Sequence, residues 1–561
     1  MKTRIIGWMG ITLSSIWMAG CSQEQILDSS FSQGDGVALS VTATSEGFVD
    51  TDNLSRVTDE GTSTTFEDGD KMGLYVVGAD KVILKNIPLT YSEGKWTADR
   101  NIYYYEGADY VAYFPYNESL ETASSASEGE TLTATVEAGI KAAGDEVLKS
   151  AVNQDQDTYH KADLMMAKVA SAAISGQSLN FKLEHQYALV EFALPVYKFK
   201  YLKANSDSEY KEFSVPMTGF TMKVNETKVT PYKTPEGTFR YLIQPDTKTT
   251  LLEVKFTDPS DSKPVTVKEK AVTLDAGNYK RYNVSIIVND TPQTPSSEAE
   301  EIDLIGCFLC DDGTIWPNKW KENVPSNVVG IIYSQIGEGD LADSDIADKD
   351  FNYYALAVNE VNGFGFDKTT EGTFDFPDGV FRVASDDSGI GNIFSIQDMS
   401  GYQSTQALIG ASIGTSIKGA LERWSKPENM ESSGWFIPSA GQYWKLTNLV
   451  SSESLGTPGW TNNSRYGFSS ENAVSTTLKE LASYCRRNVA GDRTSRVVDT
   501  KNHNYWTLTR RNALNNGNMT MYCLGYECDG QGGDNRFYIS YVNVADKSGS
   551  SLRYIRPIIA F

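Results

Sequence analysis

Apolar and polar residues alternate with a period of two through much of the first half of the chain, as in a β-strand with one buried face. The first such run is Val37, Leu39, Val41 and Ala43, which alternate with smaller residues. Beyond residue 66, short runs rich in Tyr and β-branched residues are separated by turns. They cover residues 72–78, 81–87, 101–107 and 109–116. This pattern predicts short antiparallel strands.

A second set of such runs follows a stretch at residues 121–145 that is rich in Ser, Thr, Ala and Glu and is predicted to be a loop. The runs cover residues 179–194, 239–245, 250–258 and 279–288. Because an all-β chain closes its core by stacking two sheets, we expect antiparallel sandwiches here.

Residues 291–301 are rich in Pro, Ser and Glu and lack apolar periodicity, which predicts a linker. The pattern of apolar residues changes after it. Beyond it, Ser439 and Gln442 have the spacing of a helix capping box. Apolar residues recur at helical spacing in two further places, Ile413, Ile417, Leu421 and Trp424, and Leu478, Leu481 and Cys485. Residues 302–561 are therefore predicted to form an α+β domain, with its last strand within residues 552–561.

The first residues of the chain predict where the protein is exported. Lys2 and Arg4 precede an apolar run at residues 5–18 that is too short for a membrane span, and Ala19-Gly20-Cys21 follows it. This resembles a lipoprotein signal peptide (residues 1–20), which implies a lipid on Cys21, a tether over 21–36 and, with Ser22 next, the outer membrane. An ordinary secretory signal with an incidental cysteine is the alternative.

The charge balance excludes one class of partner. The 561 residues include 73 acidic and 50 basic side chains, for a net charge of -23. Binding nucleic acid by neutralising phosphates needs clustered Lys and Arg, so no nucleic acid partner is expected. The three histidines lie far apart in sequence, and no metal site or cofactor is predicted.

Several residues could carry chemistry, but each has a plainer interpretation. Cys307 and Cys310 form C-x-x-C in an apolar run, which favours buried thiols over a redox or zinc site. Cys523 and Cys528 could bridge a hairpin, and the state of Cys485 is open. An acidic loop could bind Ca²⁺ but is favoured as solvated; it holds Asp343, Asp345, Asp348 and Asp350.

No catalytic motif accompanies His503, so packing or a surface turn is favoured for it. The tyrosine-rich strands at residues 103–116 could stack on a sugar ring, although strand core is favoured. Most tryptophans of the C-terminal half are expected in the core. The chain is predicted not to be an enzyme.

The first half resembles the fimbrillin family of type V pili and related surface lipoproteins. The resemblance rests on an ordered series of stretches: Ser55-Arg56-Val57-Thr58, FEDGDKMGLYV, YYYEGADYVAYFPY, DLMMAK, FKLEHQYALVEFAL, YLIQP and LDAGNYKRYNVSI. It implies two transthyretin-like β-sandwich domains, residues 37–168 and 169–290.

In polymerising members of that family, an arginine-specific protease removes the first strand with its lipid. A strand of another subunit then fills the groove, which is donor-strand exchange. By resemblance, Arg56 is the processing site and the displaced strand carries Val37, Leu39 and Val41. Arg56 could equally be a solvated loop residue or a residue that contacts the sandwich.

Residues 302–561 resemble the C-type-lectin-like domains of bacterial surface proteins. The matching stretches are DDGTIWP, VVGIIYSQ, YYALAV, DMSGYQST, GWFIPSAGQYWKL, YWTLT and YIRPIIAF. The resemblance implies that the final strand pairs with the first strand of the domain. Neither triplet of the calcium-dependent sugar site is present.

These expectations combine into a mainly β, non-catalytic surface lipoprotein of the outer membrane, reaching the fimbrium after processing as a minor or tip subunit. Its expected partners are other fimbrial subunits, the outer membrane through its lipid, and an unknown host or microbial ligand, glycan or protein. The alternative is a lipid-anchored binding protein that never polymerises.

Overall fold

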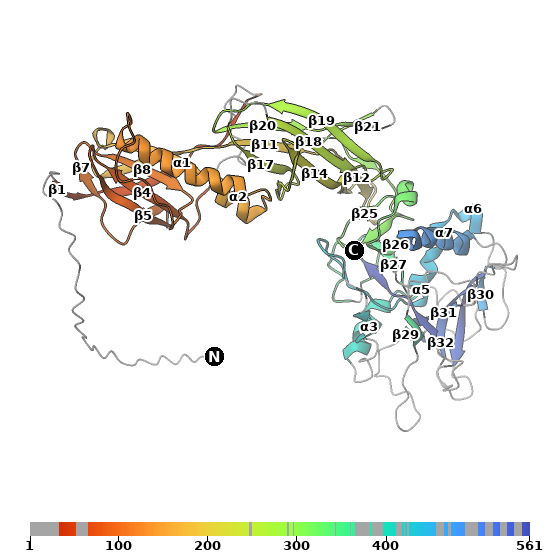
Figure 1. The fold of residues 1–561 in the computed structure, drawn as a ribbon. Helices are drawn as coiled ribbons and strands as arrows, with labels where there is room; N and C mark the ends of the chain where they lie inside the picture. Colours follow the sequence, from red (N-terminus) through yellow and green to blue (C-terminus); the bar gives the residue numbers. More distant parts are fainter. Residues whose placement is uncertain are drawn as a thin grey trace, which may run out of the picture. The chain divides into compact units, whose positions relative to one another are not determined.

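The computed structural model describes much of the chain (Figure 1). The described residues are 33–51, 65–245, 250–288, 291–294, 297–342, 344–359, 361–364, 382–383, 397–410, 418–419, 421–422, 424, 426–455, 465–468, 473–488, 503–510, 520–527, 536–543 and 553–561. Cys21 and Arg56 lie outside these residues, so the predictions of lipidation and processing stay predictions.

The chain divides into two compact units. Unit 1 holds residues up to Val190 together with Tyr241–Lys248 and Thr273–Lys280, and unit 2 holds Glu191–Arg240, Thr249–Val272 and Arg281–Phe561. The division falls within three strands, β11 (Ala188–Ala193), β17 (Phe239–Ile243) and β20 (Asn278–Asn283). The region predicted as a second sandwich, residues 169–290, is thus shared between the units.

Unit 1 contains a closed β-barrel where the sequence predicted two stacked sheets. Its strand order is β10-β2-β6-β5-β4-β8-β9. The strands are β2 (Ser40–Ser45), β4 (Lys71–Val77), β5 (Val82–Ser92), β6 (Lys95–Thr97), β8 (Asp109–Phe114), β9 (Met165–Ala170) and β10 (Ser178–His185). β2 and β10 run parallel, and the other recorded pairs of the barrel are antiparallel.

The barrel interior follows the period-two pattern of the sequence. Along β10, residues alternate between exposed and buried, with Leu179, Phe181 and Leu183 inside. The tyrosine-rich stretch supplies Tyr105, Tyr110 and Tyr113 as buried residues, three of the sequence's candidates for a sugar platform. For these three tyrosines the core interpretation is confirmed.

The prediction of a loop over residues 121–145 is wrong for much of its length, because α1 occupies Leu132–Ser150 and packs beside β8 (Figure 1). The Thr131 hydroxyl caps this helix by accepting a hydrogen bond from the Ala134 N–H at 3.1 Å. Leu132, Val136 and Ile140 recur at one-turn spacing and are buried. Small residues fill the rest of that face, so the apolar stripe is too thin to stand out in the sequence.

The first part of unit 2 contains two further sheets, whose recorded strand pairs are antiparallel except for β12 and β23, which run parallel. One sheet has the order β13-β12-β23 and another the order β15-β14-β18-β19. Their bounds are β12 (Val196–Leu202), β13 (Tyr210–Pro216), β14 (Thr218–Val224), β15 (Thr227–Val229), β18 (Thr250–Thr257), β19 (Pro264–Val272) and β23 (Glu300–Glu301). β23 lies in the predicted linker and pairs with β12, so this part of the linker is built into a sheet.

The second part of unit 2 contains two sheets. The first has the order β25-β24-β26-β27-β35, with β24 (Phe308–Cys310), β25 (Ile315–Trp316), β26 (Val328–Gln335), β27 (Tyr353–Ala357) and β35 (Ile558–Ala560). The second has the order β28-β34-β31-β32-β33-β30, with β28 (Val361–Phe364), β30 (Arg465–Phe468), β31 (His503–Arg510), β32 (Thr520–Glu527), β33 (Arg536–Asn543) and β34 (Arg553–Ile555). The last strand, β35, pairs with β27 through Leu356 and Ile558. The pairing with the first strand that the lectin-like resemblance implied is therefore wrong for β35.

Two helix predictions in unit 2 are confirmed. α7 (Ala473–Asn488) buries Leu478, Leu481 and Cys485. α5 (Ala440–Trp444) begins with the predicted capping box, in which both the Ser439 and the Gln442 side chains bond to the backbone of the first turn. The predicted helical residues Ile413 and Ile417 lie outside the described part.

The protein is mainly β, with several sheets and a minor helical content, as the sequence predicted at that level. The finer assignments to transthyretin-like and C-type-lectin-like domains stay predictions. Among the described residues, no helix has both the length and the apolar character needed to cross a membrane.

Candidate functional site

The first candidate site in unit 1 is the N-terminal segment, which we define as residues 33–51. It forms β1 (Gln33–Ala38), β2 (Ser40–Ser45) and β3 (Val49–Asp50). β1 pairs with β7 (Tyr103–Tyr105), β2 lies in the barrel wall, and β3 pairs with the start of β20. The segment thus completes three different strand edges.

β2 is hydrogen-bonded unevenly on its two sides. It pairs with β10 along six residues, whereas its recorded pairing with β6 is the single pair Val41 and Trp96. Two backbone bonds flank the ladder with β10: Ser40 N–H donates to Gln177 O at 2.7 Å, and Glu46 N–H donates to Leu183 O at 2.8 Å. β2 is therefore held chiefly along one edge.

The predicted apolar residues of the N-terminal segment face the barrel core. Leu39 is 8% exposed and Val41 is 4% exposed, whereas Ser40 and Thr42 face solvent. Burying an aliphatic side chain of this size contributes about 1.5 to 3 kcal/mol. Val37 lies in β1, but the surroundings of its side chain are outside what the structure describes.

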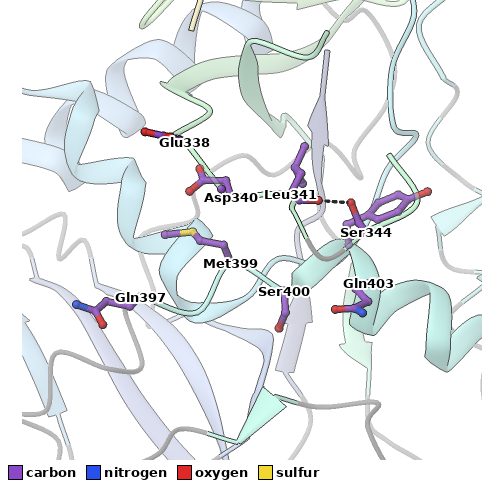
Figure 2. Close-up of a pocket in the computed structure, with 10 residues that line it drawn as sticks. Glu338, Asp340, Leu341, Ser344, Gln397, Met399, Ser400 and Gln403 are labelled. Carbon is purple, nitrogen blue, oxygen red and sulfur yellow. Dashed lines mark hydrogen bonds between the residues drawn. The ribbon is translucent and has the colours of Figure 1, made fainter. Parts of the chain in front are cut away.

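The second candidate site is a cavity of about 340 Å³ in unit 2, referred to as the loop pocket (Figure 2). One wall is the loop after β26, with Glu338, Asp340, Leu341 and Ser344, and the other is the segment that leads into α3 (Gly401–Gly410). Figure 2 shows Asp340 and Met399 on these two walls. The lining is polar, with Met399, Leu341 and Tyr402 supplying apolar surface.

Charge at the base of the loop pocket is internally balanced. The Asp340 carboxylate accepts bonds from Lys445 Nζ at 2.5 Å and from Gly337 N–H at 2.7 Å. The ammonium of Lys445 also lies 6.0 Å from the centre of the Tyr354 ring, and burial raises the pKa of Tyr354 above its ordinary value. Both bonds go to Oδ2, so Lys445 balances the charge of this carboxylate and the loop backbone holds it in place.

A buried hydrogen-bond network fixes the second wall to α5. Asp398 accepts bonds from the Ser400 hydroxyl at 2.6 Å and from the Thr509 hydroxyl at 2.5 Å. The Ser439 hydroxyl donates to the Asp398 carbonyl, and Gln442 Nε2 donates to the Met399 carbonyl at 3.0 Å. The capping box that the sequence revealed therefore also positions this wall.

Three polar side chains of the loop pocket are available to a ligand. Glu338, Gln397 and Gln403 are exposed, and none of them makes a hydrogen bond to another residue in the described part of the chain. The two amides can donate and accept hydrogen bonds, whereas the carboxylate can only accept them and disfavours anions. The sequence offered no signal for these three residues, because two separate loops bring them together.

The other predicted candidates have mostly structural surroundings. Asp350 of the acidic loop pairs with Lys203 at 3.3 Å and Lys211 at 3.1 Å, and Asp345 bonds to Tyr402. No cluster of His, Cys, Asp and Glu suited to a metal occurs among the described residues. Asp343 and Cys528 lie outside the described part of the chain. The side chains of His503 and Cys523 also lie outside it.

The prediction that Cys307 and Cys310 are buried thiols is confirmed. Cys307, Cys310 and Cys485 are buried free thiols. Burial raises the pKa of Cys307 to about 12 and that of Cys485 to about 12, and it raises the pKa of Cys310 further. Such thiols are protonated at neutral pH and make poor nucleophiles or metal ligands.

Comparison with known proteins gives the first half of the chain a family likeness. Residues 55–301 match the family described as "Fimbrillin-like". The match begins after the N-terminal segment, although that segment completes the barrel. Fimbrillins are structural and adhesion proteins, which agrees with the prediction that this protein is not an enzyme.

A curated relative is "Putative fimbrium tip subunit Fim1C" of Bacteroides ovatus, 25% identical over 329 residues. The match covers 56% of this chain and 57% of the relative, so the chain spans little more than half of that protein's length.

Among solved structures, a fimbrial protein from Bacteroides ovatus aligns with a TM-score of 0.53 at 17% identity, covering 94% of this chain and 100% of that one. At this identity the likeness extends to the fold alone. The alignment with "a putative cell adhesion protein" from Bacteroides uniformis covers 46% of this chain and 95% of that one at 16% identity, with a TM-score of 0.27.

Proposed function

We propose that this protein is a cell-surface fimbrial subunit of the tip type, carried to the outer membrane by a lipid on Cys21 and processed after Arg56. Removal of the N-terminal segment then opens the barrel wall to a strand of another subunit. The observation that carries this proposal is β2, which is hydrogen-bonded along six residues to β10 but through a single recorded pair to β6.

The position of the segment in the sequence supports the proposal. All three of its strands precede Arg56, so one cut there would separate β1, β2 and β3 together from the rest of the barrel. The exposed edge of β10 and the vacated sites of Leu39 and Val41 would accept an extended strand through backbone bonds and alternating apolar side chains. The fimbrillin-like match and the tip-subunit name of the curated relative point the same way.

The strands β34 and β35 are built into sheets of unit 2. β34 pairs with β28 and β31, β35 pairs with β27, and Phe561 is only 5% exposed. These residues already complete sheets of their own unit and are not free to be donated. The tip position itself is proposed from the printed name of the curated relative.

Substitution of the processing site tests the proposal in the producing bacterium. Arg56→Ala should leave the protein in the outer-membrane fraction at its full lipidated mass and absent from sheared filaments, whereas Arg56→Lys distinguishes an arginine-specific cut from a general one. Recovery of the Arg56→Ala protein in filaments at wild-type abundance would contradict processing-dependent assembly.

A lipid-anchored binding protein that does not polymerise is the second candidate, and the loop pocket favours it. Glu338, Gln397 and Gln403 offer a carboxylate and two amides without a partner among the described residues. The double variant Gln397→Ala, Gln403→Ala should reduce retention on immobilised neutral glycans, with exposed Thr44→Ala as control. Adhesion through this pocket would also serve a tip subunit. The two candidates are therefore distinguished by whether the protein is present in isolated filaments.

A further inference from the structure

Phe48 lies where the N-terminal segment passes from one strand edge to another. Before it, Glu46 N–H donates to Leu183 O at the end of β10; after it, Val49 N–H donates to Gly277 O at 2.8 Å, next to β20. Phe48 is 7% exposed, whereas the neighbouring Val49 is 62% exposed. The backbone is bonded on both sides of Phe48, and its side chain alone points into the protein.

The Phe48 ring stacks on His185, with ring centroids 3.8 Å apart and planes inclined by 18°. His185 is fixed from the other side, because its Nδ1–H donates to the Asp163 carboxylate at 2.8 Å, and both side chains are buried. Asp163 is itself held at the end of α2 (Gln156–Ala162), where its N–H donates to Tyr159 O at 3.1 Å. We call the His185 ring and the Asp163 carboxylate the aromatic socket.

The aromatic socket continues a row of inward-facing residues along β10. Leu179, Phe181 and Leu183 precede His185 in this row, each two residues apart. In the parallel register, Val41 lies beside Leu179 and Ala43 beside Phe181. The ladder ends where Ser45 lies beside Leu183, and Phe48 then covers His185, the last member of the row.

A turn at Gly277 fixes the backbone on the far side of the aromatic socket. Gly277 has a φ of +73°, a conformation that favours glycine, and an added Cβ would lie 3.7 Å from the His185 carbonyl. Its N–H donates to Tyr187 O, and its own carbonyl accepts from Val49. The segment is thus bonded to β10 before the aromatic socket and to the start of β20 after it. These two bonded edges set the number of residues between Val41 and the aromatic socket.

We propose that the aromatic socket is a specificity site for the strand of a neighbouring subunit that replaces the N-terminal segment. The inference rests on the proposed function. The incoming strand must carry apolar residues at the positions of Leu39 and Val41, a small residue at that of Ala43 and, after four further residues, an aromatic residue on His185. Without the aromatic ring, the buried His185 and Asp163 pair would open to water at the seam between β10 and β20.

Peptide exchange tests the aromatic socket directly. The full chain is cut after Arg56 with an arginine-specific protease, and a labelled peptide with the sequence of residues 33–51 competes with the segment already in place. We expect the Phe48→Ala peptide to enter about ten- to a hundredfold less well than the parent, since a buried aromatic side chain is lost. The Phe48→Tyr peptide keeps the ring, and Val49→Ala is the matched control at an exposed position.

The outcomes separate this inference from the proposed function. Entry of the Phe48→Ala peptide as readily as the parent would overturn the specificity site while leaving strand exchange intact. Failure of every peptide, the parent included, to enter the cut chain would overturn strand exchange and the specificity site with it.

Amide hydrogen exchange of the uncut protein is a second test, and it does not require the N-terminal segment to be replaced. In the Phe48→Ala variant, the amides of β2 and β3 should exchange faster than in the Val49→Ala variant, while those of β4 and β8 keep their protection. Equal protection of β2 and β3 in the two variants would show that the aromatic socket does not hold the segment, and it would overturn the inference.

Discussion

Leu39 and Val41 are the residues at which sequence pattern and structure agree most closely. Their alternation with polar neighbours predicted one buried face, and the structure places both side chains against the barrel core. Phe48 could not be recognised in the same way. It follows three residues without apolar side chains, and the partner that buries it, His185, lies far away in sequence.

Truncation of Leu39 should destabilise unit 1 measurably. A Leu→Ala change at a buried site costs about 2 to 5 kcal/mol, and the position of Leu39 just before β2 and its residual exposure place it near the lower figure. Urea unfolding of Leu39→Ala should therefore show a lower midpoint than wild type. Thr44→Ala, on the exposed face of β2, is the control and should unfold with the wild type; equal midpoints for both variants would contradict the packing of Leu39.

The buried thiols should be inert in the native protein. Burial raises the pKa of Cys307 to about 12, so almost no thiolate is present at pH 8. Alkylation with iodoacetamide followed by peptide mapping should leave Cys307, Cys310 and Cys485 unmodified in the native protein and label all three after denaturation. Rapid native labelling of Cys307 or Cys310 would revive a redox or metal site at the C-x-x-C.

At the scale of elements, local signals were predicted best. The capping box of α5 requires only two residues three apart, so it could be recognised from the sequence. α1 was missed because its buried stripe of Leu132, Val136 and Ile140 gains meaning only against β8. The loop pocket was missed for the same reason, since its walls come from two distant loops.

Loss of the α5 cap should disturb more than one helix turn. Ser439→Ala removes a cap worth about 1 kcal/mol and also the bond to the Asp398 carbonyl that positions one wall of the loop pocket. We expect a lower melting temperature and weaker protection of residues 397–400 in hydrogen exchange. Ser439→Gly also loses the bond to the Asp398 carbonyl but keeps most of the cap, because glycine is tolerated at this position, so it separates the two losses. Full protection of residues 397–400 in Ser439→Ala would exclude a link between cap and pocket.

At the scale of the whole molecule, sequence patterns predicted the mainly β class of the fold but not how the chain divides into two compact units. Pro, Ser and Glu at residues 291–301 predicted a boundary, yet β23 in that stretch pairs with β12 and unit 2 runs across it. Likewise, the pattern of short strands cannot distinguish two stacked sheets from a closed barrel, because both bury alternate residues. Closure depends on β2 joining β10 to β6, a pairing between distant parts of the chain.

The central claim is that the N-terminal segment is removed and its place taken by a strand of another subunit. N-terminal sequencing of the protein recovered from isolated filaments tests it most directly. We predict a mature chain that begins at Val57. A filament-associated chain that begins at the lipid-bearing Cys21, with the N-terminal segment still attached, would contradict the account.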